Sequence, residues 1–224
     1  MIKMVSLLPI NVGVNQLWEG CIMAGIAHAI GVSKYPMLSN EQSWDGINYS
    51  MQDSLGQRGT ITFGKDFCVA VFRNENSVQC RNGLETMSYF AGAPEKVIQL
   101  AKNEALQYLL EEVNGKVIPI ITTAFWGGNT LFSNDSFEDI MKKGGNLLKN
   151  QLLDEKTALY AWEKEYDMTK EQRELLEKLF MKKKSQPYQP IILPTKDLSI
   201  LKVSVEGFKE CKESFKEMNI LLIE

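Results

Sequence analysis

The segment "NQLWEGCIMAGIAHAIG" (residues 15–31) constrains the fold more than any other part of the chain. Its apolar and small residues continue nearly all round a helix, which predicts a helix from about 15 to 30 with Gly31 as its C-terminal stop. Such a helix must be buried on most of its sides. Its small residues allow neighbouring elements to approach closely, and they are Gly20, Ala24, Gly25, Ala27 and Ala29.

The middle of the chain alternates between strand and helix patterns. Two β-branched and aromatic runs flank "GKD" and predict a hairpin with strands near 60–63 and 67–72. Residues 94–115 have apolar side chains at 3.6-residue spacing, with Pro94 in the first turn and Gly115 as C-cap, and so predict a helix. The segment 116–125 is again β-rich, although Pro119 argues against a central strand position.

The C-terminal half is predicted to be mainly helical. Residues 134–166 are helical, opened by an Asp135/Glu138 capping pattern, with a kink or break at Gly144 and Gly145. A second helix follows, and Thr169 and Gln172 form its capping box. The Pro-rich segment 185–197 is the best linker candidate, and residues 198–223 are predicted as strand, helix, strand.

These elements indicate an α+β fold with a mixed sheet, a buried N-terminal helix, a central helical segment and a C-terminal strand–helix–strand. We expect residues 1–224 to form a single α+β domain, in which the helices of 135–184 are a candidate subdomain. No internal repeat or low-complexity segment is present.

Composition excludes several classes of function. A formal net charge of -3 gives no electrostatic reason to expect nucleic acid or an anionic membrane as a partner. No apolar run approaches the ~18 residues of a membrane span, and the first residues do not follow the pattern of a signal peptide. We therefore expect a soluble cytoplasmic protein that binds neither nucleic acid nor membranes.

Catalytic and metal chemistry are limited because His28 is the only histidine. The four cysteines, Cys21, Cys68, Cys80 and Cys211, are scattered, have no metal-ligand spacing and are expected to be reduced and mostly buried. Cys21 and His28 lie two turns apart on the predicted helix, about 10 Å along its axis, which is too far for direct contact. Both are therefore interpreted as structural, and the sequence predicts no metal site and no cofactor.

A Gly-Gly pair follows the β-rich segment 116–125. The backbone amides of Gly127 and Gly128 could cradle a phosphate or a carboxylate, because glycine permits close approach. However, the chain has neither the GK[ST] ending of a P-loop nor a GxGxxG motif. A tight turn satisfied by Asn129 and Thr130 is the favoured interpretation.

The stretch 40–59 is polar and interrupted by glycines. Structureless loops longer than ~12–15 residues are uncommon in compact domains and are usually functional or disordered. Large apolar residues at Trp44, Tyr49 and Leu55 favour an ordered, Ω-like loop that presents its polar side chains to a partner or a cleft. A loop that merely covers a sheet edge is an equal alternative. The predicted binding residues are Glu41, Trp44, Asp45, Asn48, Tyr49, Asp53, Arg58, Trp126, Gly127, Gly128 and Asn129.

Two functions fit these observations. The first is a binding protein of the immunity or antitoxin kind that engages a protein partner, because the chain has no complete catalytic set and carries Trp, Tyr and Arg in one loop. The alternative is a small-molecule hydrolase or transferase that uses the loop carboxylates Glu41, Asp45 and Asp53 instead of histidine. A deep pocket with convergent carboxylates would favour the enzyme, and an exposed aromatic patch would favour the binding protein.

Overall fold

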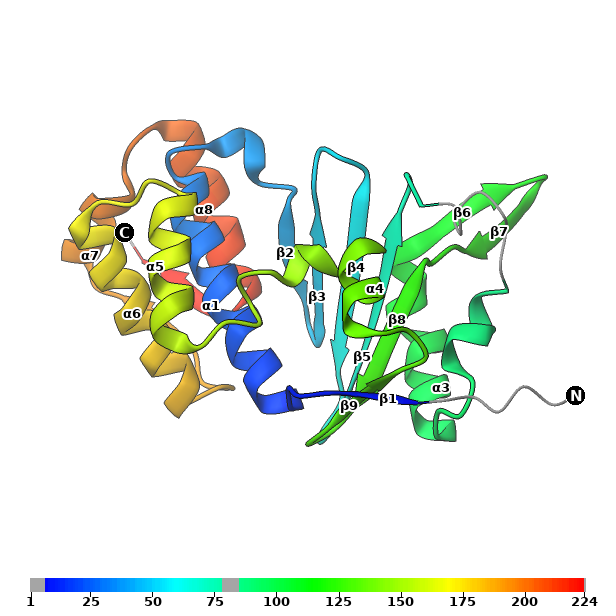
Figure 1. Cartoon of the computed structure of the whole chain (residues 1–224). Helices are drawn as coiled ribbons and strands as arrows, with labels where there is room; N and C mark the ends of the chain where they lie inside the picture. Colours follow the sequence, from blue (N-terminus) through cyan, green and yellow to red (C-terminus); the bar gives the residue numbers. More distant parts are fainter. Residues whose placement is uncertain (1–6, 78–84, 224) are drawn as a thin grey trace, which may run out of the picture. The chain divides into compact units, whose positions relative to one another are not determined.

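The computed structural model describes residues 7–77 and 85–223 and divides them into two compact units (Figure 1). Unit 1 is formed by the residues up to Gln16 together with Ile47–Lys149. Unit 2 is formed by Leu17–Gly46 together with Asn150–Glu224. Each unit is therefore assembled from two separate stretches of the chain. The α+β class predicted from the sequence is confirmed.

Unit 1 is built on an antiparallel sheet. Within this unit the strand order is β1-β9-β8-β5-β4-β3, and every adjacent pair is antiparallel. The predicted hairpin around "GKD" is confirmed, since β4 and β5 pair from Gln57↔Asn74 to Phe63↔Cys68. The strands are β1 (Leu8–Ile10), β3 (Asn48–Gln52), β4 (Gln57–Phe63), β5 (Cys68–Asn74), β8 (Thr123–Gly127) and β9 (Leu131–Ser133).

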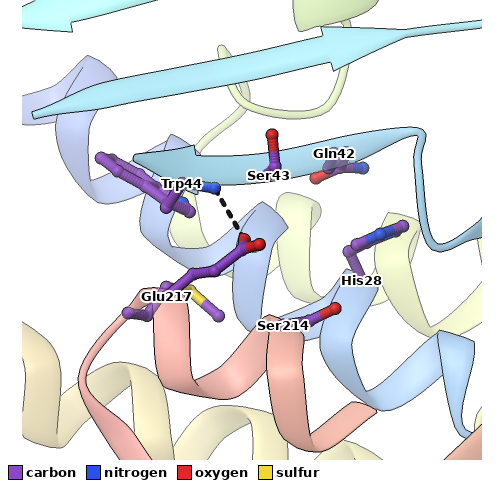
Figure 2. Close-up of a pocket in the computed structure, with 8 residues that line it drawn as sticks. His28, Gln42, Ser43, Trp44, Ser214 and Glu217 are labelled. Atoms are coloured by element: carbon purple, nitrogen blue, oxygen red, sulfur yellow. Dashed lines mark hydrogen bonds between the residues drawn. The ribbon is translucent and has the colours of Figure 1, made fainter. Parts of the chain in front are cut away.

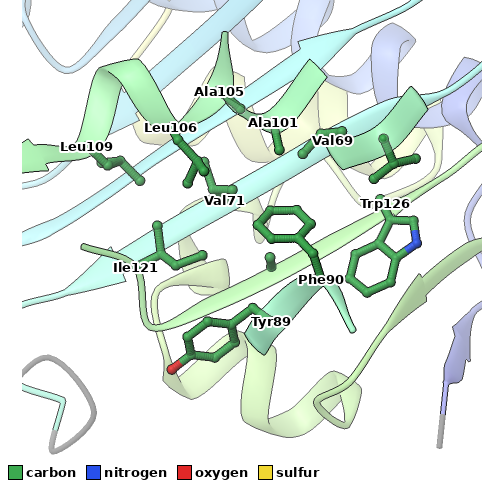
Figure 3. Packing of buried hydrophobic residues seen from close by; sticks show 12 residues of the cluster. Val69, Val71, Tyr89, Phe90, Ala101, Ala105, Leu106, Leu109, Ile121 and Trp126 are labelled. Atoms are coloured by element: carbon green, nitrogen blue, oxygen red, sulfur yellow. The ribbon is translucent and has the colours of Figure 1, made fainter. Parts of the chain in front are cut away.

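Alternation along β5 separates two packed faces of this sheet. Val69 and Val71 lie on one face, where helix α3 (Glu95–Asn103) and the 3-10 helices η2 (Thr86–Phe90) and η3 (Ala105–Leu109) pack on them (Figure 3). Phe72 points to the other face, where its ring is 5.8 Å from that of Phe125. The chain at Gly144, just after α4 (Phe137–Lys142), lies against Phe72 on this second face.

The helix predicted over 94–115 is only half correct. Helix α3 ends at Asn103, η3 continues the buried apolar face, and the chain then forms the antiparallel hairpin β6 (Leu110–Val113) and β7 (Lys116–Pro119). Asn114 and Gly115 both have positive φ, of 52° and 76°, as a tight two-residue hairpin turn requires. Gly115 therefore belongs to a hairpin turn and not to a helix C-cap.

The predicted Ω-like loop over 40–59 is wrong. The chain there forms β2 (Gln42–Asp45), β3 and the start of β4, with turns at 46–47 and 53–56. Gly46 and Gly56 have φ of 59° and 82°, values that glycine adopts without strain. Alternation is visible in the second half of β3, where the buried Met51 lies between the partly exposed Ser50 and Gln52, while Asn48 and Tyr49 are both buried. The sequence of this segment shows no clear strand periodicity because β2 and β3 are only four and five residues long.

Unit 2 packs helices around α1 (Val14–Val32), whose residues from Leu17 on belong to it. The prediction of a buried helix with close neighbours is confirmed. A Cβ atom added to Gly20 would lie 2.0 Å from the carbonyl oxygen of Gln151, and one added to Gly31 would lie 2.3 Å from the Tyr166 ring. Gly31 lies inside the helix, which continues to Val32. The other helices are η1 (Pro36–Leu38), α5 (Glu155–Glu165), α6 (Lys170–Ser185), α7 (Thr195–Leu201) and α8 (Val205–Glu217).

The predicted start signals of α4 and α6 can be compared with the caps in the structure. The capping box of Thr169 and Gln172 at the start of α6 is confirmed. The break at Gly144 and Gly145 is confirmed too, because α4 ends at Lys142, Gly144 has φ of 117° and the 3-10 helix η4 (Gly145–Leu148) follows. The N-cap of α4 is Ser136 and not Asp135, since the Ser136 side chain accepts from the Asp139 amide.

The C-terminal prediction is correct in part. The linker expected over 185–197 contains strand β10 (Ile191–Leu193), whose outer residues are buried. Strand β10 pairs in parallel with β11 (Ile220–Leu222). The strand expected after 198 is instead α7, with Pro194 as its N-cap, because Leu198 and Leu201 bury one helical face. Whether 1–224 behaves as a single domain stays a prediction.

Candidate functional site

A cavity with an open mouth lies in unit 1 and has a volume of about 310 Å³. Two turns line it, the turn after β8 at Gly127–Gly128 and the turn before β5 at Asp66–Phe67. Residues at and before the start of α3 line it as well. The full lining is Leu7, Asp66, Phe67, Gly92, Pro94, Lys96, Val97, Trp126, Gly127, Gly128, Thr130 and Phe132. We call this cavity the unit 1 pocket.

Glycine is required in the Gly127–Gly128 turn that lines the unit 1 pocket. Gly127 has φ of 145°, and a Cβ atom there would lie 2.2 Å from the carbonyl oxygen of Thr130. A Cβ atom on Gly128 would lie 2.7 Å from the carbonyl oxygen of Asp66. The Gly128 carbonyl also accepts a hydrogen bond of 2.8 Å from the Val14 amide. The Gly-Gly pair therefore permits close backbone packing, in agreement with the tight turn favoured by the sequence.

The deep wall of the unit 1 pocket is rigid. Trp126 is 2% exposed and belongs to the apolar cluster under α3, where its ring centroid is 5.7 Å from that of Phe90 (Figure 3). Val97 from α3 belongs to the same cluster and is equally buried. The pocket is thus an opening at the margin of a close-packed core, which preserves its shape without a ligand.

The charges at the mouth of the unit 1 pocket are satisfied by each other. Lys96 Nζ is 3.8 Å from Asp66 Oδ1 and 4.4 Å from the centroid of the Phe67 ring. The ammonium group therefore has both an anionic and an aromatic partner, although both side chains of the ion pair remain more than half exposed. The remaining lining offers mainly apolar atoms, which suits an uncharged apolar group.

A second cluster of polar side chains lies in unit 2, between α1, β2 and α8 (Figure 2). It contains His28 together with Gln42, Ser43, Trp44, Ser214 and Glu217. Figure 2 shows that they come from three elements and that the Ser43 side chain points away from the others. The space between them is too small to hold a water molecule, so it has no room for a substrate.

The partners of His28 fix its protonation. His28 Nε2 lies 3.5 Å from the carbonyl oxygen of Ser39, which can only accept a hydrogen bond, so Nε2 carries the proton. Nδ1 then accepts from the Tyr166 hydroxyl at 3.2 Å, and the Tyr166 oxygen in turn accepts from the Gln42 amide group. Burial lowers the pKa of His28 to about 4, so the ring is neutral near pH 7.

Trp44 and Glu217 are joined in the same cluster. The Trp44 backbone amide donates a hydrogen bond of 2.8 Å to Glu217 Oε2. Burial raises the pKa of Glu217, and the nearby charge of Asp45 acts in the same direction. The Trp44 ring lies against Gly25 of α1, where an added Cβ atom would be 2.7 Å from Nε1. These contacts give Trp44 the role of an anchor between β2, α1 and α8.

The structure does not gather the predicted binding residues into one site. Trp126, Gly127 and Gly128 line the unit 1 pocket, while the exposed Asn129 does not. Tyr49 is fully buried, and Asn48 is buried and bonded to Thr62 and Glu104 through its side-chain amide group. Among the predicted residues of unit 2, Trp44 is buried, Asp45 is exposed and Glu41 is intermediate.

Asp53 is held in a turn. Its Oδ1 accepts from the backbone amides of Leu55 and Gln57 at 2.9 Å, and its Oδ2 accepts from the Gln57 side chain at 2.9 Å. The carboxylate therefore stabilises the connection between β3 and β4. Leu55, expected as an apolar anchor, is 68% exposed, so that expectation is wrong.

The thiols fit the structural interpretation as far as the structure describes them. Cys21, Cys68 and Cys211 are buried, and Cys80 lies outside the described residues. Burial raises the pKa of the Cys68 thiol to about 12, which makes it a poor nucleophile. Among residues 7–77 and 85–223 there is no group of three or more His, Cys, Asp or Glu side chains placed to hold a metal ion. No helix in these ranges is long and apolar enough to span a membrane.

Sequence reasoning missed most of the unit 1 pocket. Asp66 was interpreted only as a turn residue, and Lys96 and Val97 only as parts of a helix. No local signal indicates that the start of α3 faces the Gly127–Gly128 turn, because that proximity depends on how β5 and β8 pair. The order of strands in the sheet brings these segments together.

The fold and the pocket define an α+β protein with a mainly apolar surface cavity in unit 1. The chain matches no protein family model, and no similar curated protein or solved structure was found.

Proposed function

We propose that this protein is a cytoplasmic binding protein of the immunity or antitoxin kind, and that the unit 1 pocket receives an apolar side chain of a protein partner. The observation that carries the proposal is the pocket itself, a rigid, mainly apolar cavity whose two mouth charges already neutralise each other. Buried apolar anchors in preformed pockets provide much of the affinity of protein interfaces.

The size of the cavity supports an anchor side chain over a larger ligand. About 310 Å³ is at the lower limit of the roughly 300–1,000 Å³ that small-molecule sites occupy. An enzyme pocket would also need polar groups that converge on the reacting atoms. Here Lys96 and Asp66 pair with each other, and Thr130, the remaining polar side chain of the lining, is exposed.

The proposal is tested by filling the pocket. Thr130→Phe places a ring at the mouth, whereas Asn129→Phe places the same ring on the neighbouring exposed residue that does not line the pocket. Proteins retained by the immobilised wild-type chain are identified by mass spectrometry, and each is then purified for measurement of its Kd. A true partner binds wild type and Asn129→Phe alike and binds Thr130→Phe about tenfold or more weakly.

Two results would contradict the proposal. Partners that bind both variants as tightly as wild type would show that the pocket is not part of the interface. A small metabolite retained by native mass spectrometry in wild type, and absent from Thr130→Phe, would instead assign the pocket to a small-molecule ligand. Circular dichroism and thermal unfolding of both variants verify that neither ring disturbs the fold.

A further inference from the structure

The β6–β7 hairpin is an exposed ribbon on unit 1. Figure 1 shows it extending beyond the end of the sheet, and every residue from 112 to 118 is exposed. Three of these are large apolar residues, Val113, Val117 and Ile118, with exposed fractions of 37%, 66% and 41%. An isolated two-stranded ribbon is marginally stable in water. Apolar side chains on both of its faces therefore indicate a surface that gains stability from a partner.

The register of the hairpin separates its two faces. Glu111 pairs with Ile118 and Val113 with Lys116, so these four side chains lie on one face, which we call the ribbon face. Leu110, Glu112, Val117 and Pro119 lie on the opposite face. The two faces differ in charge, since the ribbon face carries a lysine in addition to its glutamate and the opposite face carries only Glu112.

The glutamate of the ribbon face is already neutralised. Glu111 forms an ion pair with Arg73 of β5, which also contacts Glu75 at 2.9 Å. Arg58 of β4 is the direct cross-strand neighbour of Arg73, so its side chain lies on the same face of the sheet. The pKa of Glu111 is lowered chiefly by its hydrogen bond to Arg73, and the charge of Arg58 contributes to the shift.

Two cations remain unpaired beside the exposed apolar side chains. Arg58 and Lys116 are exposed and have no ion-pair partner among the described residues. The ribbon face and the neighbouring ends of β4 and β5 thus carry three cations, Arg58, Arg73 and Lys116, against the two carboxylates of Glu75 and Glu111. The local excess is positive although the whole chain has a net charge of -3.

We propose that the ribbon face, together with Arg58, binds an extended acidic segment of a protein partner whose carboxylates alternate with apolar side chains. The carboxylates would meet Arg58 and Lys116, and the apolar side chains would cover Val113 and Ile118. This inference rests on the proposed function, because it names the chemistry of part of the partner.

Docking on the face is favoured over addition of a strand to an edge of the ribbon. Pro119 has no amide hydrogen to offer on the β7 edge, and the edge strand β6 carries the charged side chains of Glu111 and Glu112. Both features protect strand edges from pairing. Val113 and Ile118 leave 37% and 41% of their surface exposed on the ribbon face, and this surface can be covered by a docked segment.

The test uses short synthetic peptides and the isotopically labelled full chain. A peptide that alternates Glu and Val is titrated, and amide chemical shifts are followed. The expected result is saturable shifts concentrated at residues 110–119 and around Arg58. Peptides that alternate Lys and Val, or Glu and Ser, are expected to bind at least about fivefold more weakly, because each lacks one of the two kinds of contact. Equal binding of either peptide would overturn the inference.

Pairs of matched variants test whether the peptide binds to the ribbon face. Ile118→Ser removes an apolar group from the ribbon face, while Val117→Ser removes one from the opposite face of the same strand. Ile118→Ser is expected to weaken binding of the Glu-Val peptide about two- to fivefold, and Val117→Ser to leave it unchanged. Arg58→Glu should weaken binding further and reduce its dependence on salt, whereas Lys102→Glu, the same charge change on α3, should have no effect.

The outcomes distinguish failure of this inference from failure of the proposed function. Unchanged peptide binding by Arg58→Glu and Ile118→Ser overturns the inference, even where Thr130→Phe still abolishes binding of a partner. Peptide binding that follows these variants supports the inference, even where the unit 1 pocket proves to hold a metabolite. An oligothymidylate that shifts the same amides as strongly as the Glu-Val peptide would also overturn it, because phosphates supply charge without the apolar contacts.

Discussion

The Tyr166 hydroxyl lies 3.2 Å from Nδ1 of His28, although the two residues are 138 positions apart in the chain. This contact belongs to a directed series of hydrogen bonds from Gln42 through Tyr166 and His28 to the Ser39 carbonyl. Each group in the series has its partner only while His28 is neutral with its proton on Nε2. The sole histidine of the chain is therefore part of the packing of unit 2 and is not a free acid or base.

We expect His28 to make the stability of the protein depend on pH. Its pKa is about 4 in the folded state, below the ordinary value of 6.5, so the unfolded chain binds this proton more readily. The contribution is complete above pH 6.5 and is lost as the pH falls toward 4. The loss amounts to about 3 kcal/mol at most. Urea unfolding across this range should show the decrease in wild type, and a much smaller one in His28→Gln. An identical pH dependence in both proteins would contradict it.

Gly20→Ala should destabilise the protein by roughly 2 kcal/mol or more, because the new methyl group would lie 2.0 Å from the Gln151 carbonyl oxygen. Gln16→Ala, at an exposed position of the same helix, should change the free energy of unfolding by less than about 0.5 kcal/mol. Denaturant unfolding measures both. A neutral Gly20→Ala would mean that α1 can move away from Gln151 at no cost.

Trp44 and Asp45 are neighbours in β2 with opposite expected roles. Trp44 is 8% exposed, so Trp44→Ala should cost about 3 kcal/mol or more of unfolding free energy. Asp45 is exposed, so Asp45→Ala should leave stability within about 0.5 kcal/mol of wild type. Thermal and urea unfolding compare the two variants. A tolerated Trp44→Ala would remove the anchor role that its contacts with Glu217 and Gly25 indicate.

Asp53→Ala should reduce stability by about 1–2 kcal/mol, because the amides of Leu55 and Gln57 would lose their acceptor. Asp53→Asn retains one acceptor oxygen and should lose less. Neither change should alter the Kd for a partner that the unit 1 pocket recognises. If Asp53→Ala lost a hydrolase or transferase activity of the wild type without losing stability, the alternative function would be favoured. That alternative is an enzyme that uses the carboxylates of the 40–59 segment.

The chain is expected to unfold as one cooperative transition, although its contacts divide it into two units. Hydrogen exchange under native conditions measures this directly. The slowest amides of β5 in unit 1 and of α6 in unit 2 should exchange with the same free energy of opening. Different values for the two elements would show that the units open independently.

The strongest periodic elements could be predicted from the sequence because local composition determines them. The all-apolar α1 and the Thr169–Gln172 capping box are examples. The β6–β7 hairpin was missed although Asn114-Gly115 is a strong turn signal, because the apolar spacing of α3 continues through η3 to Leu109. The helical spacing of apolar residues therefore continues beyond the end of α3.

The candidate site was less predictable than the fold. The Gly127–Gly128 turn carries a visible signal, but its neighbours at Lys96 and Asp66 are ordinary surface residues in the sequence. They reach the pocket because β5 pairs with β8 and because α3 packs on the same face of the sheet. Pairing of this kind depends on contacts between distant segments, and no short stretch of sequence encodes it.

The division of each unit into two stretches has a consequence for biosynthesis. Residues 17–46 leave the ribosome long before residues 150–224, with which they form unit 2. During that interval the apolar α1 lacks Tyr166 and the rest of the surface that covers it. Long-range contacts of this kind slow folding and leave apolar surface exposed to aggregation. Until residues 150–224 have been synthesised, α1 is therefore the segment of the nascent chain with the most apolar surface left uncovered by unit 2.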